Sequence, residues 1–128
     1  MTRAEYTKLI EKDAAAREPI WDQMQMFFMD TELTETELDR MAGACAESKY
    51  SLEELREILF LEIFPAVRFN FFALPGGEWS GFAMEWLRPR ILKTHTRGRS
   101  FQPYFWRGHT RECWQDLSSR IERLRQGS

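Results

Sequence analysis

The sequence is poor in cysteine, glycine and proline. Its 128 residues include 2 Cys, 7 Gly and 5 Pro, which excludes a disulfide-rich scaffold and a collagen-like or low-complexity chain. Neither Cys45 nor Cys113 has a Cys or His at metal-ligand spacing, so the sequence predicts no metal ion. We expect two reduced cysteines that behave as small hydrophobic side chains, with a disulfide between them as the alternative.

Long apolar runs are also missing. The longest, residues 58 to 67, is interrupted by Glu62 and Pro65 and is too short to span a bilayer. The first residues do not show the charged head and apolar stretch of a signal peptide. These observations predict a protein without a membrane span that resides in the cytoplasm.

What the chain does contain is typical of a folded domain. Hydrophobic residues make up 43%, charged residues 30% and aromatic residues 14%. A chain of this length forms one ordinary domain, here residues 1–128, and buries roughly two thirds of the surface that its unfolded form exposes. One hydrophobic core can therefore form without disulfides or metal ions.

Capping signatures indicate where helices begin. In a capping box, a Ser or Thr and a Glu three residues later satisfy each other's free backbone N–H groups. Three such pairs precede apolar residues at helical spacing: Thr2 with Glu5, Thr34 with Glu37, and Ser51 with Glu54. This agreement between caps and periodicity predicts an all-α protein.

The periodicity locates five to six helices, arranged as a single-domain bundle or orthogonal array. They are expected at residues 2–17, from Pro19 onward, after Thr34, after Ser51 up to a break or kink at Pro65, from residue 79 or 82 to 94, and from residue 109 or 110 onward. Expected inward residues include Leu55, Trp86, Leu117 and Leu124. An irregular segment near residues 66–81 and a basic aromatic loop near 96–108 complete the prediction.

Short motifs between residues 19 and 92 carry a resemblance to a known family. They are Asp30-Thr-Glu-Leu, Ser51-Leu-Glu-Glu-Leu, Glu62-Ile-Phe-Pro-Ala-Val, Asn70, Gly77-Glu-Trp, Gly81-Phe and Trp86-Leu. In these motifs the chain resembles a family of small uncharacterised bacterial helical proteins, a domain of unknown function. The resemblance implies a bacterial, cytoplasmic helical protein and assigns no catalytic residue. Pro89 and the loop near Tyr104 depart from the pattern.

Charge is unevenly distributed along the chain. Residues 1 to 65 hold 15 acidic and 7 basic residues, net −8, whereas residues 66 to 128 hold 5 acidic and 11 basic, net +6. The two halves either form separate charged surfaces or pair with each other. The densest acidic stretch lies at the start of a predicted helix, and part of it is explained by the helix dipole. Read functionally, it is an acidic edge that binds a partner with a basic surface: Asp30, Glu32, Glu35, Glu37 and Asp39.

The segment from residue 88 to 111 has the opposite character. It holds seven Lys or Arg residues, both histidines and no acid, with aromatic residues interleaved. Cations neutralise phosphates and aromatic rings stack on bases, so single-stranded nucleic acid is an alternative partner. The rings could equally cover the core while the charges pair with the acidic half. The residues of this alternative surface are Arg97, Arg99, Tyr104, Trp106 and Arg107.

Glu62 falls in the middle of an apolar helical face. A buried carboxylate must be paired, and Arg68, Arg88 and Arg90 are the candidate partners. We interpret Glu62 as a structural buried acid. An enzyme with a site around Glu62 and His95 is a third hypothesis, although the sequence contains no catalytic motif.

The leading hypothesis is therefore a non-catalytic binding protein. Small size, helical form, an acidic edge and surplus aromatic residues favour a bacterial immunity-type protein that neutralises a toxic effector by direct binding. A nucleic-acid-binding or regulatory module is the alternative. Neither hypothesis requires a catalytic residue, a cofactor or a membrane.

Overall fold

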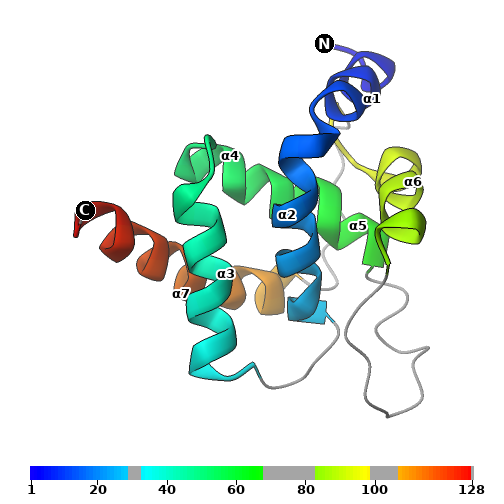
Figure 1. Ribbon diagram of the computed structural model, residues 1–128. Coiled ribbons are helices and arrows are strands. Elements are labelled where there is room, and N and C mark those ends of the chain that lie inside the picture. Colours follow the sequence, from blue (N-terminus) through cyan, green and yellow to red (C-terminus); the bar gives the residue numbers. More distant parts are fainter. Residues whose placement is uncertain (29–32, 68–82, 99–106, 128) are drawn as a thin grey trace.

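Helices account for every element that the structure describes. The computed structural model describes residues 1–28, 33–67, 83–98 and 107–127, apart from the side chains of Arg107 and His109. Within these ranges there is no β-strand, which confirms the all-α prediction (Figure 1). The elements are α1 (Arg3–Lys12), α2 (Ala14–Met24), the 3-10 helix η1 (Gln25–Phe28), α3 (Glu35–Glu47), α4 (Leu52–Glu57), the π-helix η2 (Ile58–Ile63), α5 (Phe64–Val67), α6 (Met84–Thr94) and α7 (Arg107–Gln126).

The three capping signatures all begin helices. The hydroxyls of Thr2, Thr34 and Ser51 accept the backbone N–H three residues later, at the starts of α1, α3 and α4. The reciprocal bond, in which the backbone N–H of the cap residue donates to the Glu carboxylate, forms at α1 and α4. At α4 the backbone N–H of Ser51 holds the pKa of Glu54 below its usual value.

The boundary between the first two helices differs from the prediction. α1 ends at Lys12 rather than near residue 17, and Pro19 lies inside α2 instead of beginning it. Asp13 separates the helices: its N–H donates to the Leu9 carbonyl at 3.0 Å. The Asp13 carboxylate also accepts hydrogen bonds from Lys49 and Tyr50. These tertiary contacts, which local sequence cannot reveal, fix the turn.

Pro65 does not end its helix, because α4, η2 and α5 form one continuous helical rod from residue 52 to 67. The Phe64 N–H reaches back to the Leu59 carbonyl, the wider spacing of a π-helix. Proline has no N–H to give to the carbonyl four residues before it, which belongs to Leu61. That carbonyl accepts the Thr96 N–H at 2.9 Å. The proline thus frees an acceptor that ties the segment after α6 to the rod.

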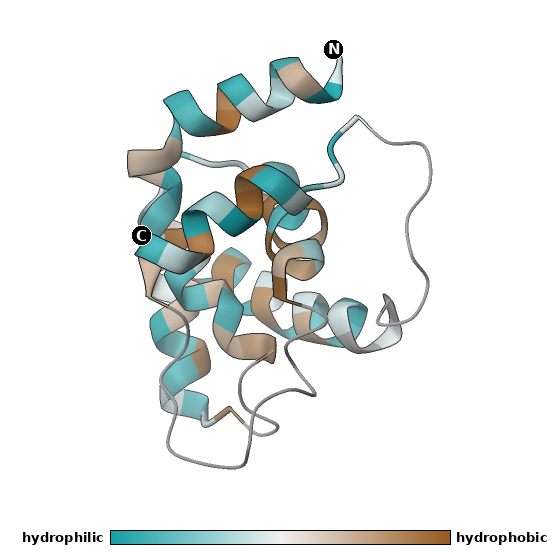
Figure 2. Cartoon of the chain, turned by 90° about the vertical axis from the view of Figure 1, so that its right-hand side faces the viewer, coloured by the Kyte–Doolittle hydropathy of each residue, from teal (hydrophilic) through white to brown (hydrophobic). Residues whose placement is uncertain are grey.

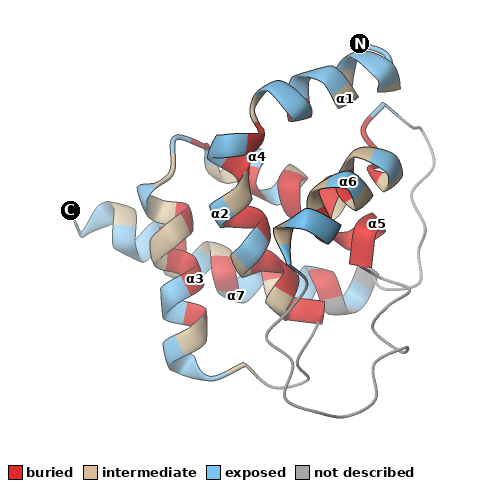
Figure 3. Ribbon diagram, turned by 45° about the vertical axis from the view of Figure 1, so that its right-hand side comes forward, coloured by how far each residue is buried: buried red, intermediate tan, exposed pale blue. Residues whose placement is uncertain are grey.

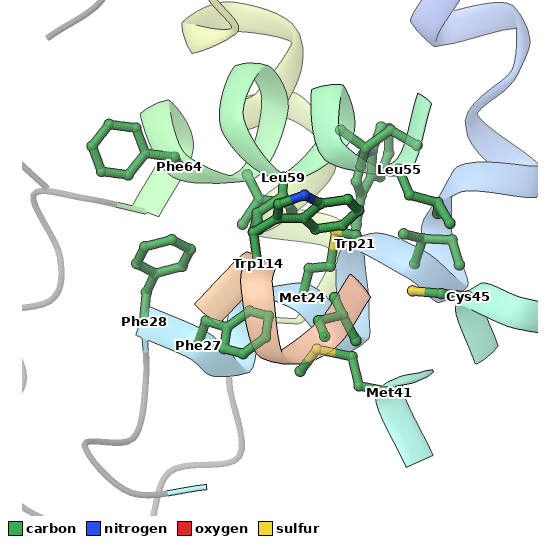
Figure 4. Close-up of a cluster of buried hydrophobic side chains, with 14 of the residues drawn as sticks. Trp21, Met24, Phe27, Phe28, Met41, Cys45, Leu55, Leu59, Phe64 and Trp114 are labelled. Carbon is green, nitrogen blue, oxygen red and sulfur yellow. The ribbon is translucent and has the colours of Figure 1, made fainter. Parts of the chain in front are cut away.

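The core lies where the rod meets α2, α3, α6 and α7. Large side chains such as Trp21, Leu55 and Leu117 are completely buried there, and Figure 4 shows Trp21 and Trp114 among the clustered aliphatic and aromatic residues. Phe28 and Phe64 pack ring against ring at 5.9 Å. α3 packs along α7, and Figure 3 shows that their buried residues face the same interior. One continuous core therefore joins elements from both halves of the chain.

Some predicted inward positions are wrong. Trp86 is 38% exposed and Leu124 is 47% exposed. Trp86 lies on the outer side of α6, where the guanidinium carbon of Arg90 is 5.8 Å from the centre of the indole ring. Leu124 belongs to the last turns of α7, which project beyond α3 (Figure 1). Helix α1 is similarly peripheral: it is largely hydrophilic in Figure 2, and Ile10 is its one buried residue.

Candidate functional site

Glu62 is held in the centre of the fold by three donors. It lies in η2 and has no exposed surface. One carboxylate oxygen accepts the Trp21 indole N–H at 2.8 Å. The other accepts the guanidinium of Arg17 at 2.5 Å and that of Arg97 at 2.7 Å. Both oxygens are occupied and no solvent reaches them, so this arrangement supports a structural role for Glu62.

The partners of Glu62 differ from the three candidates named from sequence. Arg88 pairs with Glu18 at 3.1 Å, and the Arg90 Nε donates to the Ala66 carbonyl at 3.3 Å. Arg68 lies outside the described residues. Arg17 and Arg97 take their place because η2 faces α2 and the turn after α6, rather than the exposed side of α6.

The buried charges continue outward through a chain of ion pairs. Arg17 also binds Asp13 at 3.0 Å, and Asp13 accepts from both Lys49 and the Tyr50 hydroxyl at 2.6 Å. Burial alone would lower the pKa of Arg17, but the charge and hydrogen bond of Glu62, together with the charges of Tyr50 and Asp13, outweigh it and raise that pKa. For the carboxyl group of Asp13, burial acts in the opposite direction and would raise the pKa, but hydrogen bonds from Lys49 and Tyr50 lower it. Each charge in this chain is therefore stabilised by a neighbour.

His95 belongs to a separate contact that docks α1. His95 is fully buried, with its Nε2 2.7 Å from the Thr7 hydroxyl oxygen. That hydroxyl donates its proton to the Arg3 carbonyl, so His95 Nε2 is the donor in the pair. Arg3 in turn donates to the carbonyls of His95 and Lys93 at the end of α6. Glu62 bonds to other groups, so the structure does not join Glu62 and His95 into one site.

The acidic edge is partly present on the described surface. Glu35 and Asp39 lie on α3, and their side chains are 82% and 69% exposed. Both bind Arg120 of α7, at 2.6 and 2.7 Å. Glu37 accepts a hydrogen bond from the Thr34 hydroxyl. Asp30 and Glu32 lie outside the described residues.

The alternative basic surface loses one of its named residues. Arg97 is 7% exposed because its guanidinium is turned inward onto Glu62 and also binds Glu57 at 3.1 Å. Its assignment as a surface residue is therefore wrong. Arg99, Tyr104 and Trp106 lie outside the described residues, as does the side chain of Arg107 at the start of α7. The acidic and basic halves pair with each other at Glu18, Glu57, Glu62, Glu35 and Asp39.

A pocket between α2 and α3 adjoins the acidic edge. Its volume is about 230 Å³, and it opens to solvent. The lining residues are Asp22, Gln23, Met26, Leu33, Glu37, Arg40 and Met41. Of these, only Glu37 was predicted from the sequence. The other signal in the sequence was the placement of Met26 and Met41 on either side of the acidic stretch, because methionine is common at adaptable binding surfaces.

The described residues offer neither a metal site nor a membrane span. They contain no group of three or more His, Cys, Asp or Glu side chains that could hold a metal ion. No helix among them is long and apolar enough to cross a bilayer. Cys45 and Cys113 are free thiols, the former buried and the latter half-buried.

Comparison with known proteins identifies the family of the chain. No curated protein matches it, and no solved structure does. Residues 15–126 match a domain of unknown function, DUF7079. This match covers all of the fold described above except α1, the Asp13 turn and the start of α2. The chain therefore belongs to the DUF7079 family, whose members share this domain of unknown function.

Proposed function

We propose that the protein is a non-catalytic binding protein that docks a protein partner through the α3 side of the fold. The observation that carries the proposal is the pocket between α2 and α3, which lies beside exposed carboxylates of α3. A concave, partly apolar site with a charged border is the usual form of a protein-binding hot spot. The partner is accordingly a protein with a basic surface.

The charge on this side supports a basic partner. Glu35, Asp39 and Asp116 all bind Arg120, so three carboxylates share one guanidinium. The Arg120 side chain is only 11% exposed, whereas the side chains of Glu35, Asp39 and Asp116 are 82%, 69% and 46% exposed. The solvent-facing part of the cluster is therefore negative. Such a surface accelerates the capture of a cationic protein by long-range attraction.

Within this class, we propose a bacterial immunity-type role in which the protein neutralises a toxic effector. A small, rigid helical domain suits this role because tight inhibition requires a preorganised surface. The core of this domain is preorganised by the ion pairs of Glu62 and by continuous packing between both halves. Affinity would come from the pocket and association rate from the carboxylates around it.

Co-expression with a neighbouring gene tests the immunity role. The product of the gene directly upstream would be induced in a sensitive host, with and without this protein. We expect growth arrest in its absence and rescue in its presence, together with a complex that survives gel filtration. As a matched control, Glu53→Gln changes an exposed carboxylate on α4, whose side chain is 71% exposed, and should rescue as well as the wild type. A harmless neighbour, or arrest that this protein does not relieve, would overturn the immunity role.

Titration with single-stranded DNA and RNA tests the alternative partner. The inward orientation of Arg97 and the pairing of Arg88 with Glu18 leave fewer cations for phosphates. We therefore expect no binding tighter than about 10⁻⁴ M at physiological salt, the weak end of non-specific affinity. Tight binding that weakens steeply with salt would support the nucleic-acid function instead.

A further inference from the structure

The pocket between α2 and α3 combines an apolar floor with charged walls. Met41 is 1% exposed and forms the most buried part of the lining, with Met26 and Leu33 half-buried beside it. Asp22 and Glu37 contribute carboxylates from α2 and α3, respectively. A partner group that fits this lining needs both a hydrocarbon portion and a charge.

The two carboxylates are held in place before any partner arrives. The Gln25 side chain donates to Asp22 at 3.2 Å, and the Thr34 hydroxyl donates to Glu37 at 3.0 Å. Each bond uses one of the several lone pairs of a carboxylate, so both groups can still accept hydrogen bonds. Fixed acceptors bind a cation at a lower entropic cost than mobile ones.

Of the lining residues that the structure describes, Arg40 is the one cation, and it does not balance the two acids. Among the described residues it forms no ion pair, although Glu37 is only three positions away on the same helix. The lining therefore carries a net negative charge. An anionic occupant would be repelled by two carboxylates and attracted by one guanidinium. A purely apolar occupant would displace water from these charged groups without offering them hydrogen bonds in its place.

We propose that this pocket receives a long basic side chain, lysine or arginine, from the protein partner. This inference rests on the proposed function and identifies the anchor residue of the partner. Lysine and arginine have a methylene stem that packs on apolar surface and a cationic head that remains polar. The stem lies on Met26, Leu33 and Met41, and the head binds the carboxylates of Asp22 and Glu37 by charge-assisted hydrogen bonds.

The methionine methyl groups provide a direct readout with small probes. The full chain, labelled with ¹³C at the methionine methyl groups, would be titrated with n-butylguanidinium and n-butylammonium, which reproduce the two side-chain ends. We expect saturable shifts at Met26 and Met41, with dissociation constants on the order of millimolar for molecules of this size. The methyl group of Met24, which is buried in the core and is not part of the pocket lining, should shift less than either. n-Pentanol and n-butyrate serve as neutral and anionic probes and should bind at least about 10-fold more weakly.

Substitutions assign the charges. Asp22→Asn with Glu37→Gln should weaken n-butylguanidinium binding at least about 10-fold. Arg40→Gln should strengthen it, which is an effect that loss of folding cannot produce. Glu53→Gln, an exposed and distant carboxylate, should leave it unchanged.

Three outcomes would overturn the inference. The first is n-pentanol binding as tight as that of the two cations. The second is binding of n-butyrate to the wild type that disappears in Arg40→Gln. The third is the absence of saturable shifts with either cation. None of these results depends on the protein partner. If the probes fail while the neighbouring toxin is still neutralised, the anchor is wrong and the proposed function stands. If the probes bind and no neutralisation occurs, the pocket binds cations but the immunity role is wrong.

Discussion

Replacing Glu62 should be among the most damaging single changes in the protein. Glu62→Ala leaves two guanidinium groups and an indole N–H without their shared acceptor, all in the interior. Breaking a buried ion pair from one side costs about 3–5 kcal/mol. The loss is kept within that range because Arg17 retains Asp13 and Arg97 retains Glu57. Against a typical domain stability of about 5–15 kcal/mol, the variant should remain folded but be clearly weakened.

The conservative substitution should have a smaller effect. In Glu62→Gln the amide oxygen still accepts one hydrogen bond, but the amide NH₂ faces a donor. We expect a loss of about 1.5–3 kcal/mol, the value of a hydrogen bond to a charged group. Should Glu62→Ala fail to fold, Arg97→Met combined with Glu62→Gln removes a cation together with the anion. That double variant should cost less than the sum of its two single changes, Arg97→Met and Glu62→Gln.

Urea unfolding followed by circular dichroism measures these losses as shifts in the unfolding free energy. The matched control is Glu53→Ala on the same helical rod, where the carboxylate is 71% exposed and 3.8 Å from Arg56. Its effect should lie within about 0.5 kcal/mol of zero. An unfolding free energy for Glu62→Ala as close to the wild type as that of Glu53→Ala would refute the buried-network reasoning.

Three further predictions concern packing, acid stability and thiol reactivity. Leu55→Ala and Leu117→Ala should each cost about 2–5 kcal/mol by urea unfolding, because both side chains are completely buried; unchanged midpoints would contradict this packing. The lowered pKa of Asp13 means that its stabilising effect is complete above the unfolded value near 3.8 and disappears as the pH falls through the folded value. Asp13→Asn should therefore lose less stability than the wild type as the pH falls below about 4. An unfolding free energy that falls equally with pH in both proteins would argue against the ion pairs of Asp13. Burial raises the pKa of Cys45 to about 12 and that of Cys113 to about 11, so at pH 8 iodoacetamide should modify Cys113 first and reach Cys45 only on unfolding; equal labelling rates in the folded protein would contradict the burial of Cys45.

The sequence predicted most reliably what depends on neighbouring residues. The caps at Thr2, Thr34 and Ser51 were correct because each bond spans three positions. The burial of Leu55 and Leu117 followed from helical periodicity, since the apolar face of a helix must turn inward. These local rules were sufficient to predict the all-α fold.

Contacts between distant residues could not be predicted. Glu62 binds Arg17, which is 45 positions away in the sequence, and Arg97, which is 35 positions away. These residues come close only when α2 and the turn after α6 pack on the rod. The continuation of the helix past Pro65 was not predicted for the same reason, because Thr96 satisfies the carbonyl that the proline leaves free. Local sequence marks a charge or a missing donor but does not identify the distant group that compensates for it.

The candidate site was predicted only in part. Glu35, Glu37 and Asp39 were singled out from the sequence as part of an acidic stretch, but the pairing of two of them with Arg120 spans more than 80 positions. The pocket beside them was not predicted, because its walls come from two helices whose packing the sequence does not define. Charge pattern therefore indicated the region, and tertiary structure supplied its shape.

The most direct test of the proposed docking surface is the association rate of the protein with the neutralised partner at several salt concentrations. The variant carries Glu35→Gln, Glu37→Gln and Asp39→Asn, and stopped-flow fluorescence would report binding. The control carries Glu11→Gln and Glu53→Gln, exposed positions outside this face. The wild-type and control rates should fall steeply with salt, whereas the triple variant should associate about 10-fold more slowly at low salt and depend less on it. Equal rates and equal salt dependence for the triple variant and the wild type would contradict a docking surface on α3.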